Sequence, residues 1–154
     1  MAPETPGKLP PGDFPALNNM SELILLLDKE AIAQKVSTVA KLISKDYQGS
    51  DLVIVGVLHG AFIFMADLIR QLSIDGFTID FVRLSSYGDQ SVSSGRIRLL
   101  LDIEADIDGK DVLIVEDILD TGLTMTYLME HLQSRRPRSI KICVFINKLE
   151  RRRT

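Results

Sequence analysis

The sequence has one cysteine, two histidines and no tryptophan. A lone Cys143 cannot form an internal disulfide, and two histidines leave no Cys/His cluster for a structural zinc site, so we expect a reducing, cytoplasmic location. No apolar run approaches the roughly 20 residues that span a bilayer. The N-terminus has no apolar stretch behind basic residues, so we expect neither a membrane partner nor a secretory signal.

The chain also lacks an excess of positive charge. Its 18 Lys and Arg residues against 21 Asp and Glu give a formal charge of -3, which offers no net attraction for nucleic acid. A small anionic substrate would therefore need a local site. With 154 residues, 45% of them hydrophobic, the chain has the size of one globular domain.

Proline is scarce except at one end of the chain. Residues 1–20 hold five of the six prolines and show neither helical nor strand periodicity. We therefore expect a flexible N-terminal extension at residues 1–20 and a core domain at residues 21–154.

Apolar spacing in the core domain predicts an α/β fold. We expect strands at residues 52–58, 77–84, 96–101, 112–115 and 140–146 and a first helix at residues 29–44. Two further helices have expected buried stripes at Phe62, Met65, Ala66, Ile69 and Leu72, and at Met125, Leu128, Met129 and Leu132. Repeated strand-helix-strand units with a hairpin-like insertion predict a central, mainly parallel sheet flanked by helices.

The segment at residues 112–126 carries most of the chemical information. Glu116 and Asp117 end an apolar strand, and Asp120 precedes a Thr-Gly pair at the start of a helix. First-turn N–H groups and a glycine suit phosphate, and carboxylates suit ribose hydroxyls or magnesium. Asp120 or Thr121 as an ordinary N-cap with nothing bound is the alternative.

Residues 115–124, VEDILDTGLT, resemble the 5-phosphoribosyl 1-pyrophosphate (PRPP) signature of the hypoxanthine-guanine type of purine phosphoribosyltransferase. Residues 57–72 resemble the pyrophosphate loop and helix of that family, residues 80–88 its mobile catalytic loop, and residues 146–152 its purine-contact strand end. The resemblance covers the chain from about residue 21 onward. It implies a type I phosphoribosyltransferase fold, which is a Rossmann-like core with a flexible loop insertion.

The resemblance also implies roles around the phosphate and the sugar. Glu116 and Asp117 would bind the ribose hydroxyls, directly or through Mg²⁺, and Asp120 would act as general base toward the purine ring. Contacts to the 5-phosphate are implied for Thr121, Gly122, Leu123 and Thr124. The implied reaction is purine salvage, in which PRPP and a 6-oxopurine such as hypoxanthine or guanine give IMP or GMP and pyrophosphate.

Other implied contacts lie outside this signature. Leu58, His59 and Gly60 match the pyrophosphate loop, in which the first peptide bond can be cis and the middle residue is usually lysine rather than His59. Ser86 and Tyr87 would close over the site. The resemblance places Ile118 and Lys148 at the base and Arg152 near the pyrophosphate.

The resemblance ends at Thr154, where family members continue with a segment that covers the purine. The base-covering half of the site is then expected only at Ile118, Asp120 and Lys148. Two alternatives to a transferase stay open here: a non-catalytic module that binds PRPP or a nucleotide, and a truncated, inactive scaffold. Membership of the family also implies a homo-oligomer, either a dimer or a tetramer.

Overall fold

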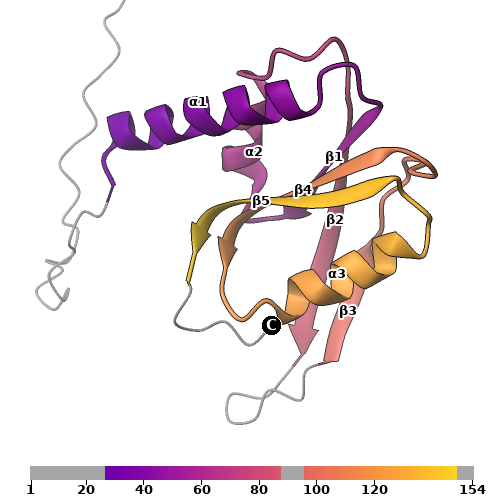
Figure 1. Ribbon diagram of the computed structural model, residues 1–154. Coiled ribbons are helices and arrows are strands. Elements are labelled where there is room, and N and C mark those ends of the chain that lie inside the picture. Colours follow the sequence, from indigo (N-terminus) through magenta and orange to yellow (C-terminus); the bar gives the residue numbers. More distant parts are fainter. Residues whose placement is uncertain (1–26, 88–95, 149–154) are drawn as a thin grey trace, which may run out of the picture.

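A five-stranded sheet forms the centre of the computed structural model, which describes residues 27–87 and 96–148 (Figure 1). The strand order is β3-β2-β1-β4-β5. All neighbouring strands are parallel except β2 and β3, which form an antiparallel pair. The strands are β1 (Leu52–Leu58), β2 (Thr78–Tyr87), β3 (Arg96–Leu101), β4 (Asp111–Leu119) and β5 (Ser139–Asn147).

Helices cover both faces of this sheet. Helices α1 (Lys29–Asp46) and α2 (Phe62–Ile69) lie on one face and α3 (Leu123–Gln133) on the other (Figure 1). Two apolar cores result, and β4 contributes to both because successive strand residues point to opposite faces. Val112 and Ile114 pack in the core on the α3 side, and Leu113 and Val115 in the core on the α1 and α2 side. The predicted fold class is confirmed.

Helix α1 has the amphipathic character that its spacing predicts. The side chain of Asp28 caps its first turn by accepting a 2.7 Å hydrogen bond from the backbone N–H of Ala31. The buried face carries Val36, Ala40 and Ile43, and the helix extends two residues beyond the predicted end at residue 44.

The predicted buried stripe of α2 is confirmed at Met65 and wrong at Phe62. Phe62 is 53% exposed, whereas Leu68, which the prediction left out, is fully buried. Ala61, Met65 and Leu68 are buried, and the predicted residues Ile69 and Leu72 are partly buried against the same core. The sequence of this short helix, FIFMADLI, is apolar almost all round, so periodicity does not define which face is buried.

Asp111 anchors the start of β4 through a buried polar cluster. Its carboxylate accepts hydrogen bonds from Arg138 Nε at 3.0 Å, from Arg138 Nη2 and from Ser139 Oγ at 2.7 Å. The hydrogen bonds from Arg138 are the main reason that the pKa of Asp111 falls to about 2. This cluster ties the first residue of β4 to the first residue of β5.

The five predicted strands are all present, and β4 is longer than predicted because it continues to Leu119. Glu116 and Asp117 therefore lie within the strand rather than after it. The expected extension at residues 1–20 lies outside the described residues. None of the helices in the described part of the chain has the length and apolar character that crossing a membrane requires.

Candidate functional site

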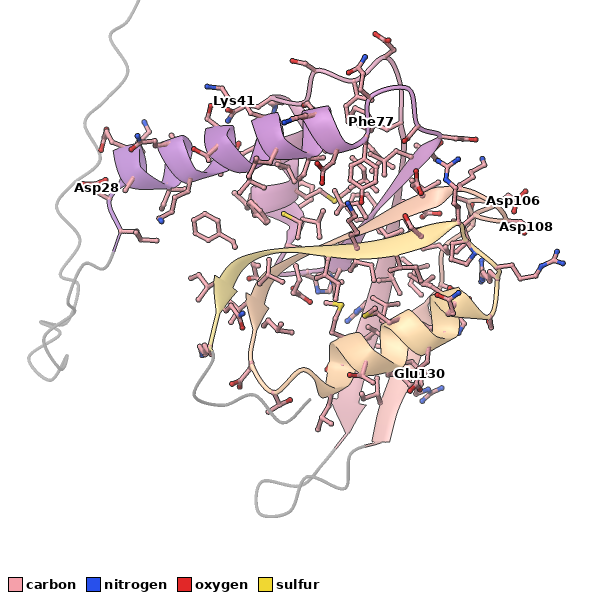
Figure 2. The ribbon with its side chains drawn as sticks, in the orientation of Figure 1. Asp28, Lys41, Phe77, Asp106, Asp108 and Glu130 are labelled. Carbon is pink, nitrogen blue, oxygen red and sulfur yellow. The ribbon has the colours of Figure 1, made fainter. Side chains whose placement is uncertain are left out.

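The carboxyl ends of the two central strands, β1 and β4, lie at the same edge of the sheet because these strands are parallel neighbours. Asp106 and Asp108 lie near the opposite end, in the connection that precedes β4 (Figure 2). There Asp108 pairs with Arg136 at 2.7 Å, so this second acidic group is part of an ion-paired surface. The acids of β4 stand apart from it, next to the turn that leads into α3.

That turn encloses a pocket of about 140 Å³. It is lined by Glu116, Ile118, Leu119, Asp120, Thr121, Gly122, Thr124 and Met125. The structure thus brings together six residues that the sequence singled out. Leu119 and Met125 were missed as lining residues: Met125 was expected only in the buried stripe of its helix, and an apolar Leu119 gives no signal for a polar site.

The environment of Glu116 disfavours the charged form of its carboxyl group. Burial raises its pKa to about 8, and the adjacent Asp117 side chain adds to the rise. The backbone N–H of Asp117 donates a 3.1 Å hydrogen bond to Glu116 Oε1, which opposes the rise in part. A positive charge placed beside this pair would therefore favour ionised Glu116.

Helix α3 begins at Leu123 with Gly122 as its N-cap, so neither Asp120 nor Thr121 is the N-cap residue. Gly122 has φ +86° and no side chain to hydrogen-bond the first turn. The first N–H groups of a helix have no acceptor within the helix and carry the positive end of its dipole. This end of α3 opens on the pocket and suits an anionic group such as phosphate.

A second loop meets the acidic pair from β1. The peptide bond between Leu58 and His59 is cis, as the family resemblance allows. The next residue, Gly60, lies against Asp117: a Cβ atom on Gly60 would be 2.6 Å from Oδ2 and 2.7 Å from Oδ1 of that carboxylate. Asp117 is therefore packed against the loop at the end of β1, whereas Glu116 faces the pocket before α3.

The end of β5 runs beside the pocket. The backbone N–H of Lys148 donates a 2.9 Å hydrogen bond to the carbonyl oxygen of Leu119, so Lys148 lies next to the strand end that precedes Asp120. Ile118 is 42% exposed and lines the pocket. Both predicted base contacts thus lie at one edge of the sheet.

The remaining predicted site residues lie outside the pocket lining or outside the described part of the structure. Leu123 is the first residue of α3 and is absent from the pocket lining. Ser86 and Tyr87 belong to the end of β2, and their side chains lie outside the described part of the structure. Arg152 is outside the described residues altogether.

The donor set at the end of β4 fits Mg²⁺. Two adjacent carboxylates supply hard oxygen ligands, and the raised pKa of Glu116 marks a place where a cation would be favourable. Within residues 27–87 and 96–148 there is no group of three or more metal-ligating side chains. Mg²⁺ is usually held by one or two carboxylates together with water and substrate phosphates.

A family model and individual known proteins both match most of this chain. A family model described as "Phosphoribosyl transferase domain" matches residues 25–154. The chain is 46% identical over 134 residues to the hypoxanthine-guanine phosphoribosyltransferase of Aquifex aeolicus, an alignment that covers 86% of this chain and 74% of that protein. It is 39% identical to the hypoxanthine phosphoribosyltransferase of Escherichia coli, over 83% of this chain and 72% of that protein.

The fold comparison agrees. The crystal structure of a hypoxanthine phosphoribosyltransferase from Staphylococcus aureus superposes with a TM-score of 0.81 at 40% sequence identity, covering 85% of this chain and 71% of that chain.

Proposed function

The chain belongs to the phosphoribosyltransferase family, and from that premise we propose that it is a purine salvage enzyme. It transfers the 5-phosphoribosyl group of PRPP to hypoxanthine or guanine and releases pyrophosphate, with IMP or GMP as product. The observation that carries this proposal is the pocket before α3, where Glu116 and Asp120 stand above a helix N-terminus capped by glycine.

The phosphate end of the substrate is assigned to the turn before α3. Thr121, Gly122, Leu123 and Thr124 would hold the 5-phosphate through backbone N–H groups and the two hydroxyls. The absence of a side chain on Gly122 supports this assignment, because it leaves room for close approach to the start of the helix.

Glu116 and Asp117 would hold the ribose hydroxyls and Mg²⁺. The bound ion would supply positive charge that stabilises the pyrophosphate as it leaves. The two carboxylates fix the ribose while positive charge develops at its anomeric carbon. The contact between Gly60 and Asp117 supports a further role for Leu58, His59 and Gly60, which would lie beneath the departing pyrophosphate.

Asp120 and Lys148 would orient the base. Asp120 accepts a proton from a ring nitrogen of the purine as the new bond to the anomeric carbon forms. Lys148 donates to the exocyclic oxygen, and Ile118 packs against the ring. Roles for Ser86 and Tyr87 over the site and for Arg152 near the pyrophosphate stay predictions, as do the homo-oligomer, the cytoplasmic location and the domain limits at residues 1–20 and 21–154.

The test is nucleotide formation by the purified 154-residue chain with Mg²⁺, PRPP and either hypoxanthine or guanine, followed by chromatography of the products. We expect IMP or GMP together with an equal amount of pyrophosphate. Thermal stabilisation by PRPP without any nucleotide product would refute the transferase and favour a binding module. Neither product nor stabilisation would favour an inactive scaffold.

A further inference from the structure

The pocket before α3 has an apolar floor, which consists of Leu119 and Met125. Both residues line the pocket together with its polar residues, yet Leu119 is only 7% exposed and Met125 only 4% exposed. Both also belong to the apolar core on the α3 side of the sheet. The floor of the pocket is therefore continuous with the hydrophobic core.

Met125 lies one turn after the start of α3. It follows the N-cap residue Gly122 by three positions, so the two residues lie on the same face of the helix. Long side chains in a helix lean back toward its N-terminus and cover the preceding turn. The side chain of Met125 therefore extends toward the helix start, where Gly122 is itself buried, and this direction agrees with its place in the pocket lining.

An apolar floor changes how the first-turn N–H groups of a helix bind an anion. At an exposed helix start, water competes for these N–H groups and screens the charge of the anion. Where an apolar side chain excludes water, the hydrogen bonds and the helix dipole act in a lower dielectric and hold the anion more strongly. A residue that offers no hydrogen bond can in this way increase the affinity for phosphate.

We propose that Met125 determines the affinity of the site for the 5-phosphate group by keeping water away from the first turn of α3. This inference rests on the proposed function, which assigns the 5-phosphate to that turn, and it gives a core residue a role in binding. Truncation of Met125 would leave a space beside the first turn that water can enter, because polar groups line the adjoining pocket. A hydrogen bond to a charged group is worth about tenfold or more in affinity, so we expect a loss of about that size.

The experiment compares Met125→Ala with Met129→Ala. Met129 is a matched control because it is the same residue type one turn later on α3, packs against the same core and does not line the pocket. Both substitutions remove the same atoms from the core side of the helix, so both should lower stability toward urea. Met125→Leu keeps nearly the same apolar volume and should retain the parent affinity. Met125→Val is a milder truncation for the case that Met125→Ala does not fold.

Isothermal titration with ribose 5-phosphate and with pyrophosphate in the presence of Mg²⁺ tests the proposal without turnover. We expect Met125→Ala to raise the Kd for ribose 5-phosphate about tenfold and to leave the Kd for pyrophosphate unchanged, because pyrophosphate is assigned to the loop after β1. Met129→Ala and Met125→Leu should match the parent chain for both ligands.

Steady-state kinetics gives a second measurement. The KM for PRPP should rise about tenfold while kcat and the KM for the purine stay at the parent values, since losing an interaction made equally in the ground and transition states raises KM alone. An unchanged Kd for ribose 5-phosphate in a folded Met125→Ala variant would overturn the inference even if nucleotide is formed. So would an equal rise in Met129→Ala, or no measurable binding of ribose 5-phosphate by the parent chain. A selective rise would support it even if no nucleotide is formed.

Discussion

Replacing Gly60 by alanine should disable the site without unfolding the protein. The added Cβ atom would lie 2.6, 2.7 and 2.8 Å from Oδ2, Oδ1 and Cγ of Asp117. Carbon atoms do not approach to such distances, so either the carboxylate or the loop must move by a sizeable fraction of an ångström. Both belong to the proposed site, and Gly60 itself is exposed, so the disturbance falls on ligand geometry rather than on the core.

The size of the effect follows from that displacement. A misplacement of about 1 Å in a positioned catalytic group can lower the rate by about 100-fold, which corresponds to about 2.7 kcal/mol of transition-state stabilisation. We therefore expect kcat/KM for PRPP to fall by about 100-fold in Gly60→Ala. Steady-state kinetics with saturating purine and varied PRPP measures this quantity directly.

Gly76→Ala is the control for the same substitution. A Cβ atom at Gly76 would meet nothing within 4 Å, and this residue precedes β2, at the end of the parallel strands opposite to the acidic pair. We expect its kinetics to equal those of the parent chain, and circular dichroism should show both variants folded. Unchanged kcat/KM in a folded Gly60→Ala variant would refute the view that the loop after β1 and Asp117 act as one unit.

Three further outcomes are expected. Asp120→Asn should lower kcat by about 100-fold or more while the dissociation constant for PRPP stays within about threefold, measured by titration calorimetry and steady-state kinetics; equal losses in both would contradict the role as base. Asp111 has a pKa lowered from 3.8 to about 2, so it stabilises the fold by about 2 kcal/mol above pH 4 and this contribution is lost as the pH falls toward 2. Urea unfolding of the parent chain and Asp111→Asn should accordingly differ at pH 6 and converge toward pH 2. Leu128→Ala removes a fully buried side chain on α3 and should lower the free energy of unfolding by about 2–5 kcal/mol, measured with urea; a loss below 1 kcal/mol would contradict its place in the core.

The sequence predicted the fold well where apolar patterns were unambiguous. The strand at residues 52–58 is apolar on both faces, and its predicted bounds agree with β1. At α2 the pattern wrongly included Phe62 and omitted Leu68, because a helix that is apolar on nearly every side gives a weak periodic signal for its buried face. It also shortened β4, since Glu116 and Asp117 read as the end of an apolar run although the hydrogen-bonded ladder continues past them.

The candidate site was predictable in part for a similar reason. A local motif could place Glu116, Asp120 and the Thr-Gly pair at one strand-to-helix turn, because these residues lie close together in the sequence. The packing of Gly60 on Asp117 depends on the pairing of β1 with β4, which no local pattern encodes. The hydrogen bond from the backbone N–H of Lys148 to the carbonyl oxygen of Leu119 likewise depends on the pairing of β4 with β5.

The pairing of β1 with β4 also links the appearance of activity to the folding order. The ends of these strands carry Gly60 and Asp117, which are far apart along the chain and meet only when the two central strands are in register. Contacts between distant segments form late and slowly in folding, because loop closure must precede them. Recovery of ligand binding after dilution from denaturant should therefore coincide with completion of the sheet, so that bound ligand serves as a kinetic reporter of the last long-range step.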